Sequence, residues 1–234
     1  MSDALPKEGI GDEVHRGVRA VLSAIPIAGG AAVELFNRLL APPIQRRRDA
    51  WLNDLADRVS KLEQEGRVKL DDLCNNDEFI SSVLQASLIA VRNHQQEKFE
   101  ALRNAVLNTA LGQSPDDARR EIFLRFIGEL TVNHLQLLAF LANPEQWFVR
   151  HNKPIPSFGI TPSLHGVIKD AMPDLLKQDD FLELLVSDLS QRKLFSGSGI
   201  HTMMSAEAWK AKRTTDLGDE FIRFISDYEK VGQK

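Results

Sequence analysis

Cysteine is nearly absent from this chain of 234 residues, which contains Cys74 alone. A single cysteine excludes an internal disulfide and a metal site built from several thiolates. Such low cysteine content is typical of the reducing cytoplasm. The N-terminal stretch MSDALPKEGIGDEVHRG also lacks the basic start and apolar run of a signal peptide. We therefore expect a cytoplasmic protein.

The residue patterns that mark catalytic and metal sites are missing as well. The six histidines form neither an H-x-x-x-H nor an H-E-x-x-H pair. The sequence contains no G-x-x-x-x-G-K, no G-x-G-x-x-G after a strand and no G-x-S-x-G. We predict a protein that is not an enzyme, with no catalytic residues, no cofactor and no metal.

A basic excess is absent too, because 29 Lys and Arg stand against 33 Asp and Glu, for a formal net charge of −4. This balance does not favour a nucleic-acid backbone or an anionic membrane as a partner. Any such contact would need a local basic patch, and the candidate residues are Arg46, Arg47, Arg48, Lys210, Lys212 and Arg213. The first three are consecutive, so on a helix they spread around the axis and favour a solvated surface over a phosphate cradle.

A long uninterrupted apolar run is also lacking, and residues 18–41 come nearest to one. Charged residues together with Pro and Gly interrupt this stretch, so a membrane-spanning helix is not expected. We predict a helical hairpin buried in the core, with Ala32, Val33, Phe36 and Leu40 covered by the helix over residues 81–111. The alternative is a hairpin that leaves the fold and inserts into a membrane.

What the sequence does contain is helical periodicity, most clearly over residues 81–111, which have neither Gly nor Pro. We predict one long amphipathic helix there, capped by Asn75 or Asn76 and ended by Gly112. Its polar middle, residues 92–98, is where a bend is expected.

Further helices are predicted on both sides of this one. They cover residues 12–25, residues 44–65 after a kink or restart at Pro42-Pro43, a segment that Ser114 caps, residues 132–141 behind Thr131, and a short turn from Asn143. The proline-rich residues 152–162 indicate a linker. Beyond it we predict helices over 162–172, 173–177 and 179–194, two short strands before Arg213, and a helix that Thr215 caps.

The segments DLSQRKLFSGSG and RTTDLGDEFIRFI carry a resemblance. The first is similar to the end of the third helix of a winged-helix domain and the turn into its wing. The second is similar to the T-x-x-G closure from strand to helix in such domains. The last third of the chain therefore resembles the winged-helix family, which implies an α+β domain that binds DNA or docks a protein.

Charge favours protein over DNA in this region, because residues 154–234 hold ten basic against twelve acidic side chains. The part before the linker resembles an uncharacterised bacterial helical protein, a likeness that implies no function.

These observations predict a mainly α fold: an N-terminal multi-helix bundle with a small C-terminal winged-helix-like (α+β) domain. The expected division is a disordered lead-in at 1–10, a bundle at 11–151, a linker at 152–162 and the winged-helix-like domain at 163–234. The predicted function is that of a non-enzymatic cytoplasmic interaction or adaptor protein, which binds a protein partner or itself. The alternatives are a DNA-binding regulator that uses Lys210, Lys212 and Arg213, and a membrane-active effector that uses the 18–41 hairpin.

Overall fold

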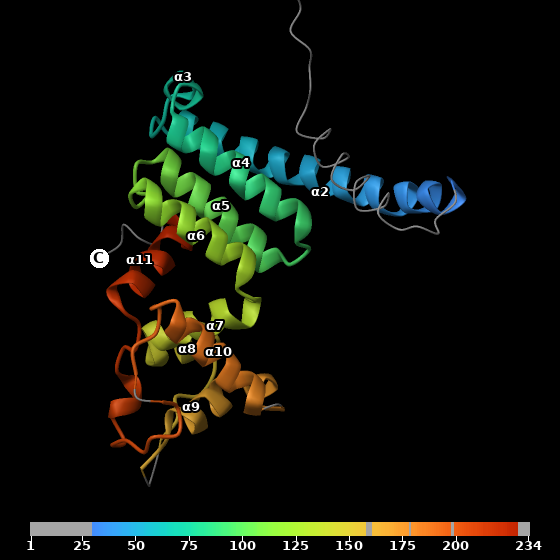
Figure 1. The fold of residues 1–234 in the computed structure, drawn as a ribbon. Coiled ribbons are helices and arrows are strands. Elements are labelled where there is room, and N and C mark those ends of the chain that lie inside the picture. Colours follow the sequence, from blue (N-terminus) through green and yellow to red (C-terminus); the bar gives the residue numbers. More distant parts are fainter. Residues whose placement is uncertain (1–29, 158–160, 178, 198, 229–234) are drawn as a thin grey trace, which may run out of the picture.

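The computed structural model describes residues 30–157, 161–177, 179–197 and 199–228, and this part of the chain is mainly helical (Figure 1). The elements in chain order are α2 (Gly30–Gln64), α3 (Leu70–Cys74), α4 (Asp77–Arg92), α5 (Gln96–Ala110), α6 (Asp117–Glu129), α7 (Val132–Ala142), α8 (Pro144–Arg150), α9 (Leu164–Ala171), the 3-10 turn η1 (Pro173–Lys177), α10 (Asp179–Gln191), the 3-10 turn η2 (Ala208–Lys210) and α11 (Asp216–Ile225). The predicted mainly α class is confirmed.

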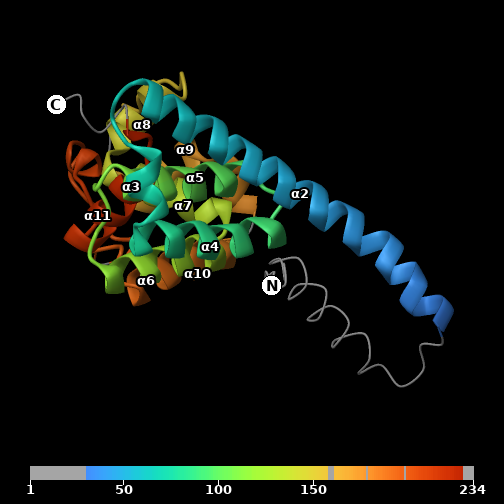
Figure 2. The same cartoon turned by 90° about the horizontal axis from the view of Figure 1, so that it is seen from above.

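Helix α2 runs through Pro42-Pro43 without a break, so the predicted restart is wrong. Each proline removes one amide donor, a loss that is tolerated where the freed carbonyls reach water. The first half of α2 projects beyond the ends of α4 and α5, whereas its second half packs on α4 (Figure 2). Two predictions lie outside the described residues: the helix over residues 12–25 and the first helix of the apolar hairpin. The side chains of residues 30–42 are also outside the described part of the chain.

The long helix predicted over residues 81–111 is two helices, α4 and α5, which pack against each other as a hairpin. Asn93 is extended, with φ −107° and ψ 160°, and its amide closes the end of α4 on the Ala90 carbonyl. The polar run at 92–98 therefore contains a chain reversal. Two apolar stripes that would be exposed on one straight helix bury each other when the chain folds back.

Several predicted helix ends are confirmed by their caps. Asn76, Thr131 and Thr215 each accept a hydrogen bond from a backbone amide three residues on. Ser114 is not a cap, because α6 begins later and Asp116 accepts from the Arg119 amide. A carboxylate there also interacts favourably with the positive end of the helix dipole.

The C-terminal region lacks the strands expected for a winged helix, as far as residues 161–228 are described. Only two isolated antiparallel bridges occur there, between Ser163 and Met203 and between Phe195 and Thr214. Helix α10 also ends at Gln191, three residues before the predicted end. The α+β character implied by the resemblance is therefore not supported.

Helix α11 packs on α5, more than a hundred residues away in sequence (Figure 1). The amide of Asn104 donates to the Ile225 carbonyl at 3.0 Å, and the buried amide of Asn108 donates to the Phe224 and Ser226 carbonyls at 2.8 and 3.0 Å. These two side chains, one helical turn apart on α5, satisfy the carbonyls that the end of α11 leaves without helical partners. The proposed domain boundary at 152–162 stays a prediction.

The T-x-x-G sequence at the start of α11 has a physical role in this packing. Gly218 donates its amide to Thr215 Oγ1 at 3.0 Å. A Cβ at Gly218 would lie 2.3 Å from the Leu194 carbonyl oxygen, so only glycine allows this close approach of two backbones.

Candidate functional site

An apolar groove lies between the second half of α2, α3 and the start of α4. It encloses about 360 Å³, and its lining is Val59, Leu70, Leu73, Cys74, Phe79, Ile80, Val83 and Leu84. Val59 and Leu73 are buried and form its floor, whereas Leu70, Ile80 and Leu84 are exposed at its rim. We call this surface the α2–α4 groove.

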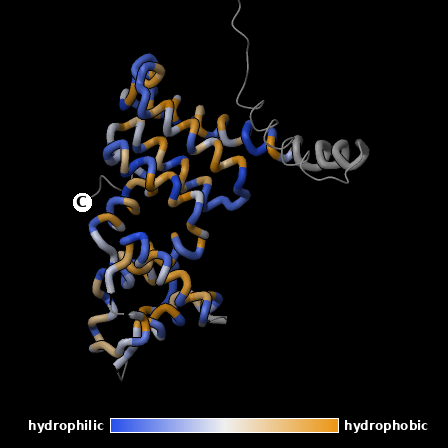
Figure 3. Tube along the Cα trace, in the orientation of Figure 1, coloured by the Kyte–Doolittle hydropathy of each residue, from blue (hydrophilic) through white to orange (hydrophobic). Residues whose placement is uncertain are grey.

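The exposed apolar surface continues along α4 beyond the groove. Ile80, Leu84 and Leu88 are four residues apart and share one face, with exposed fractions of 38, 43 and 45%. Leu52 of α2 is also exposed. Its neighbour Trp51 donates Nε1–H to Ser87 Oγ at 3.0 Å, and this bond sets Leu52 at about the level of Leu88 along the two helices. Hydrophobic positions recur along both helices in this region (Figure 3). An exposed apolar series of this kind is typical of a surface that another molecule covers.

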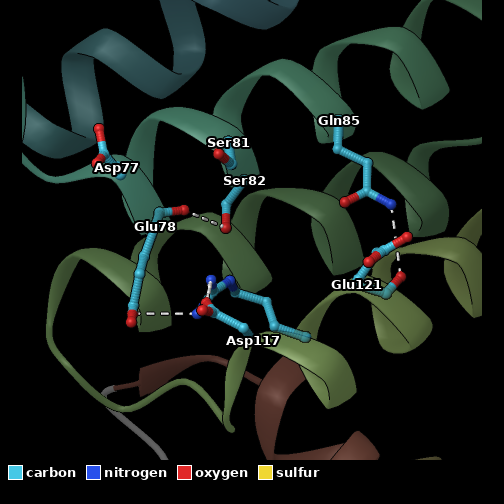
Figure 4. Close-up of a pocket in the computed structure, with 8 residues that line it drawn as sticks. Asp77, Glu78, Ser81, Ser82, Gln85, Asp117 and Glu121 are labelled. Carbon is cyan, nitrogen blue, oxygen red and sulfur yellow. Dashed lines mark hydrogen bonds and ion pairs between the residues drawn. The ribbon is translucent and has the colours of Figure 1, made fainter.

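A second, polar pocket of about 380 Å³ lies between α4 and α6 (Figure 4). Its centre is Arg120, whose buried guanidinium contacts two carboxylates. The Nη1 atom lies 3.0 Å from Glu78 Oε2, and Nη2 contacts Asp117. These carboxylates neutralise the arginine, so the pocket does not present a strong anion site. The contacts join α4 to α6, and we assign the pocket a structural role.

Two ionisable side chains are buried where α5, α6, α7 and α10 meet. Lys98 Nζ donates to the Gly128 carbonyl at 3.0 Å, and burial lowers the pKa of Lys98. This bond supplies a donor to the C-terminal end of α6, where a cation also interacts favourably with the helix dipole.

The second buried group is His134, the third residue of α7. Its Nδ1 accepts from the Thr131 amide at 3.1 Å, which completes a capping box. Its Nε2 lies 3.5 Å from Asp188 Oδ2, and burial lowers the pKa of His134 despite this carboxylate. Groups with perturbed pKa values also occur at active sites, but here burial accounts for both shifts and each side chain caps a helix end. Neither role is evident in the sequence, since no local pattern links Lys98 to Gly128 or His134 to Asp188.

The structure places the six candidate anion contacts in two separate regions. Arg46, Arg47 and Arg48 lie on α2 before it reaches the bundle, the first two exposed and the third paired with Asp49 at 3.1 Å. The other three lie in the C-terminal region and have partners within the fold. Lys210 pairs with Glu145 and Glu207 at 3.2 and 3.0 Å, and Lys212 pairs with Asp219 at 2.5 Å.

Arg213 is half-buried and serves the backbone of its own loop. Its guanidinium donates to the Trp209, Ala211 and Ala208 carbonyls at 3.1, 2.7 and 2.7 Å. Burial lowers its pKa. These bonds fix the turn at η2, so most donors of this side chain already have acceptors.

The described residues also bear on metal binding and on membranes. No group of three or more His, Cys, Asp and Glu side chains is arranged there to hold a metal ion. None of the helices in the same ranges combines the length and apolarity that crossing a membrane requires.

Comparison of the chain with protein-family models, with curated proteins and with solved structures yields no significant match.

Proposed function

We propose that this protein is a non-enzymatic interaction protein that receives an amphipathic helix in the α2–α4 groove. The observation that carries the proposal is the exposed series Ile80, Leu84 and Leu88, which continues an apolar groove with a buried floor. A partner helix fits such a groove with apolar residues spaced three and four apart.

The groove is also built on rigid elements. Helix α4 packs against α2, α5 and α6, and the Trp51–Ser87 hydrogen bond holds α2 and α4 in register. A groove that is already formed loses little conformational freedom on binding, which favours affinity. We propose a cytoplasmic location, from the cysteine content.

The test is site-specific photo-crosslinking in cells of the source organism. A photoreactive amino acid at Leu84 should give a discrete crosslinked protein band, and the additional change Ile80→Glu should abolish it. The matched control carries the same photoreactive group at Glu100, an exposed position on α5. Equal crosslinking from both positions, or none from Leu84, contradicts the proposal.

A DNA-binding function is the second candidate, and the observation in its favour is the exposure of Arg46 and Arg47 on α2. The ion pairs of Lys210 and Lys212 weaken this candidate, because those cations already have partners. Mobility shifts with random duplex DNA that fade steeply as salt rises would support it. The absence of a shift near ~50 mM salt would remove it.

A further inference from the structure

The first half of α2 projects from the bundle (Figure 2) and has a largely apolar sequence. We call residues 30–50 the α2 arm, which is roughly 30 Å long at 1.5 Å per residue. Between residues 31 and 41 its polar positions are Glu34, Asn37 and Arg38 only. Apolar residues therefore occupy most of the helix circumference between residues 31 and 41. A helix that is apolar on most of its circumference is normally buried on more than one side.

The arm cannot fold back onto the groove of its own chain. It is continuous with the second half of α2, which forms one wall of that groove. An arm that enters the groove must therefore belong to another molecule. The most economical donor is a second copy of this chain, since every copy offers one arm and one groove.

We propose that two copies of this chain pair through α2, each laying its arm antiparallel along the α2–α4 groove of the other. This inference rests on the proposed function of the groove and names its occupant. The arrangement is isologous, with a two-fold axis that crosses α2 near Arg48.

The spacing of apolar residues agrees with this axis. An axis at Arg48 sets Ile44 beside Leu52 of the other copy, Leu40 beside Ala56 and Phe36 beside Ser60. Leu52 and Ala56 are exposed, and Ser60 is next to the groove residue Val59. Three apolar positions of the arm thus fall along the second half of α2. The same register sets Arg47 beside Asp49 of the other copy, so opposite charges meet near the axis.

The mass of the full-length protein in solution tests the proposal, measured by light scattering after gel filtration at tens of micromolar. We expect about twice the chain mass of 26.3 kDa. Leu84→Glu in the groove and Phe36→Glu in the arm should each give a folded monomer, with the far-ultraviolet circular dichroism unchanged. The matched control Leu184→Glu, at an exposed leucine on α10, should remain a dimer.

A crosslink tests the register. The arrangement sets Val33 beside Glu63 of the other copy, and Leu70, which lines the groove with Cys74, donates its amide to Glu63 at 3.3 Å. A Val33→Cys variant treated with a short bismaleimide should therefore form a covalent dimer through Cys74. The product should disappear in Val33→Cys/Cys74→Ser, and Glu100→Cys should not form a dimer with Cys74.

The outcomes separate the two proposals. A monomeric wild-type protein, or a dimer that persists in both Leu84→Glu and Phe36→Glu, overturns the paired-arm inference. If a monomeric protein still crosslinks from Leu84 to a different protein in cells, the groove function stands and its occupant is another chain. If neither dimer nor crosslink forms, both proposals are wrong.

Discussion

At the scale of single residues, Asn108 links α5 to α11, which lie far apart in the sequence. It is buried, and its amide nitrogen contacts three carbonyls at the end of α11, those of Arg223, Phe224 and Ser226. An amide has only two N–H groups, so the three acceptors share two donors. Together with Asn104, which donates to the Ile225 carbonyl, this side chain supplies hydrogen bonds to the carbonyls at the end of α11.

Replacing Asn108 by Leu should lower the free energy of unfolding by about 1–3 kcal/mol, because buried carbonyls are left without donors. Urea denaturation measures the change. Asn53→Leu, at an exposed position on α2, is the control and should stay within about 0.5 kcal/mol of wild type. A loss equal to that of the control would show that the carbonyls of α11 find other donors.

His134 predicts a dependence of stability on pH. Burial lowers its pKa in the folded state, so the unfolded chain binds its proton at a higher pH. The folded protein should therefore lose stability as the pH falls below about 6.5, the ordinary pKa of histidine. The loss should continue until the pH reaches the lower pKa of His134 in the folded state. Protonation of Nδ1 also removes the acceptor for the Thr131 amide. The groups that face the ring are Asp188, Arg192 and Lys98.

The variant His134→Gln isolates this effect, since Gln at the third helical position keeps the capping box but does not titrate. Between pH 7 and pH 5 the free energy of unfolding should fall less in the variant than in wild type. Parallel curves would mean that other groups set the acid sensitivity.

At the scale of elements, the sequence predicted the existence of most described helices but not every break between them. Caps such as Thr131 and Thr215 are local, so residues three apart suffice to predict them. The reversal at Asn93 is different, because the residues on either side have good helical periodicity. It forms because α4 and α5 bury each other. This packing is a contact between two helices, so a local stretch of sequence does not reveal it.

The α2–α4 groove could not be predicted from local sequence either. Helix α4 has apolar residues on more than one face, among them Phe79, Ile80, Val83 and Leu84. Periodicity alone cannot tell which face the fold covers. The positions of α2 and α3 decide that Ile80 and Leu84 stay exposed, so these candidate residues emerged only from the structure.

Two glycines at equivalent helix positions give a matched test at this scale. Gly166 and Gly218 each follow a capping Ser or Thr by three residues and donate to its hydroxyl. A Cβ at Gly166 would meet only Ser163 Oγ, at 3.6 Å, whereas one at Gly218 would meet a carbonyl oxygen at 2.3 Å. Gly166→Ala should be neutral or stabilising by up to about 1 kcal/mol, because Ala favours helix.

Gly218→Ala should instead destabilise the protein by about 1–3 kcal/mol, since two backbones must separate. Thermal unfolding of the two variants side by side measures the difference. Equal effects would mean that the Leu194 segment moves aside without cost.

At the scale of the whole molecule, nearly all of the buried apolar residues in the described part of the chain form one cluster, which runs from Trp51 of α2 to Tyr228 beyond α11. Phe123 of α6 has its ring centroid 5.2 Å from that of Phe221 in α11. Residues on both sides of the predicted linker at 152–162 thus share apolar contacts. Shared contacts of this kind couple the stabilities of the two regions.

The two regions should therefore unfold together, and tryptophan fluorescence can follow each one. Trp51 is buried in α2 and Trp209 is buried in η2, at opposite ends of the cluster. Variants in which Trp51 or Trp209 is the sole tryptophan, with Trp147 also replaced by Phe, should show coincident urea transitions, because a cooperative unit unfolds without a populated intermediate. The change Asn108→Leu, which loosens α11 from α5, should move both midpoints downward together. Two separated transitions, with only the Trp209 midpoint moved by Asn108→Leu, would instead support independent domains on either side of residues 152–162.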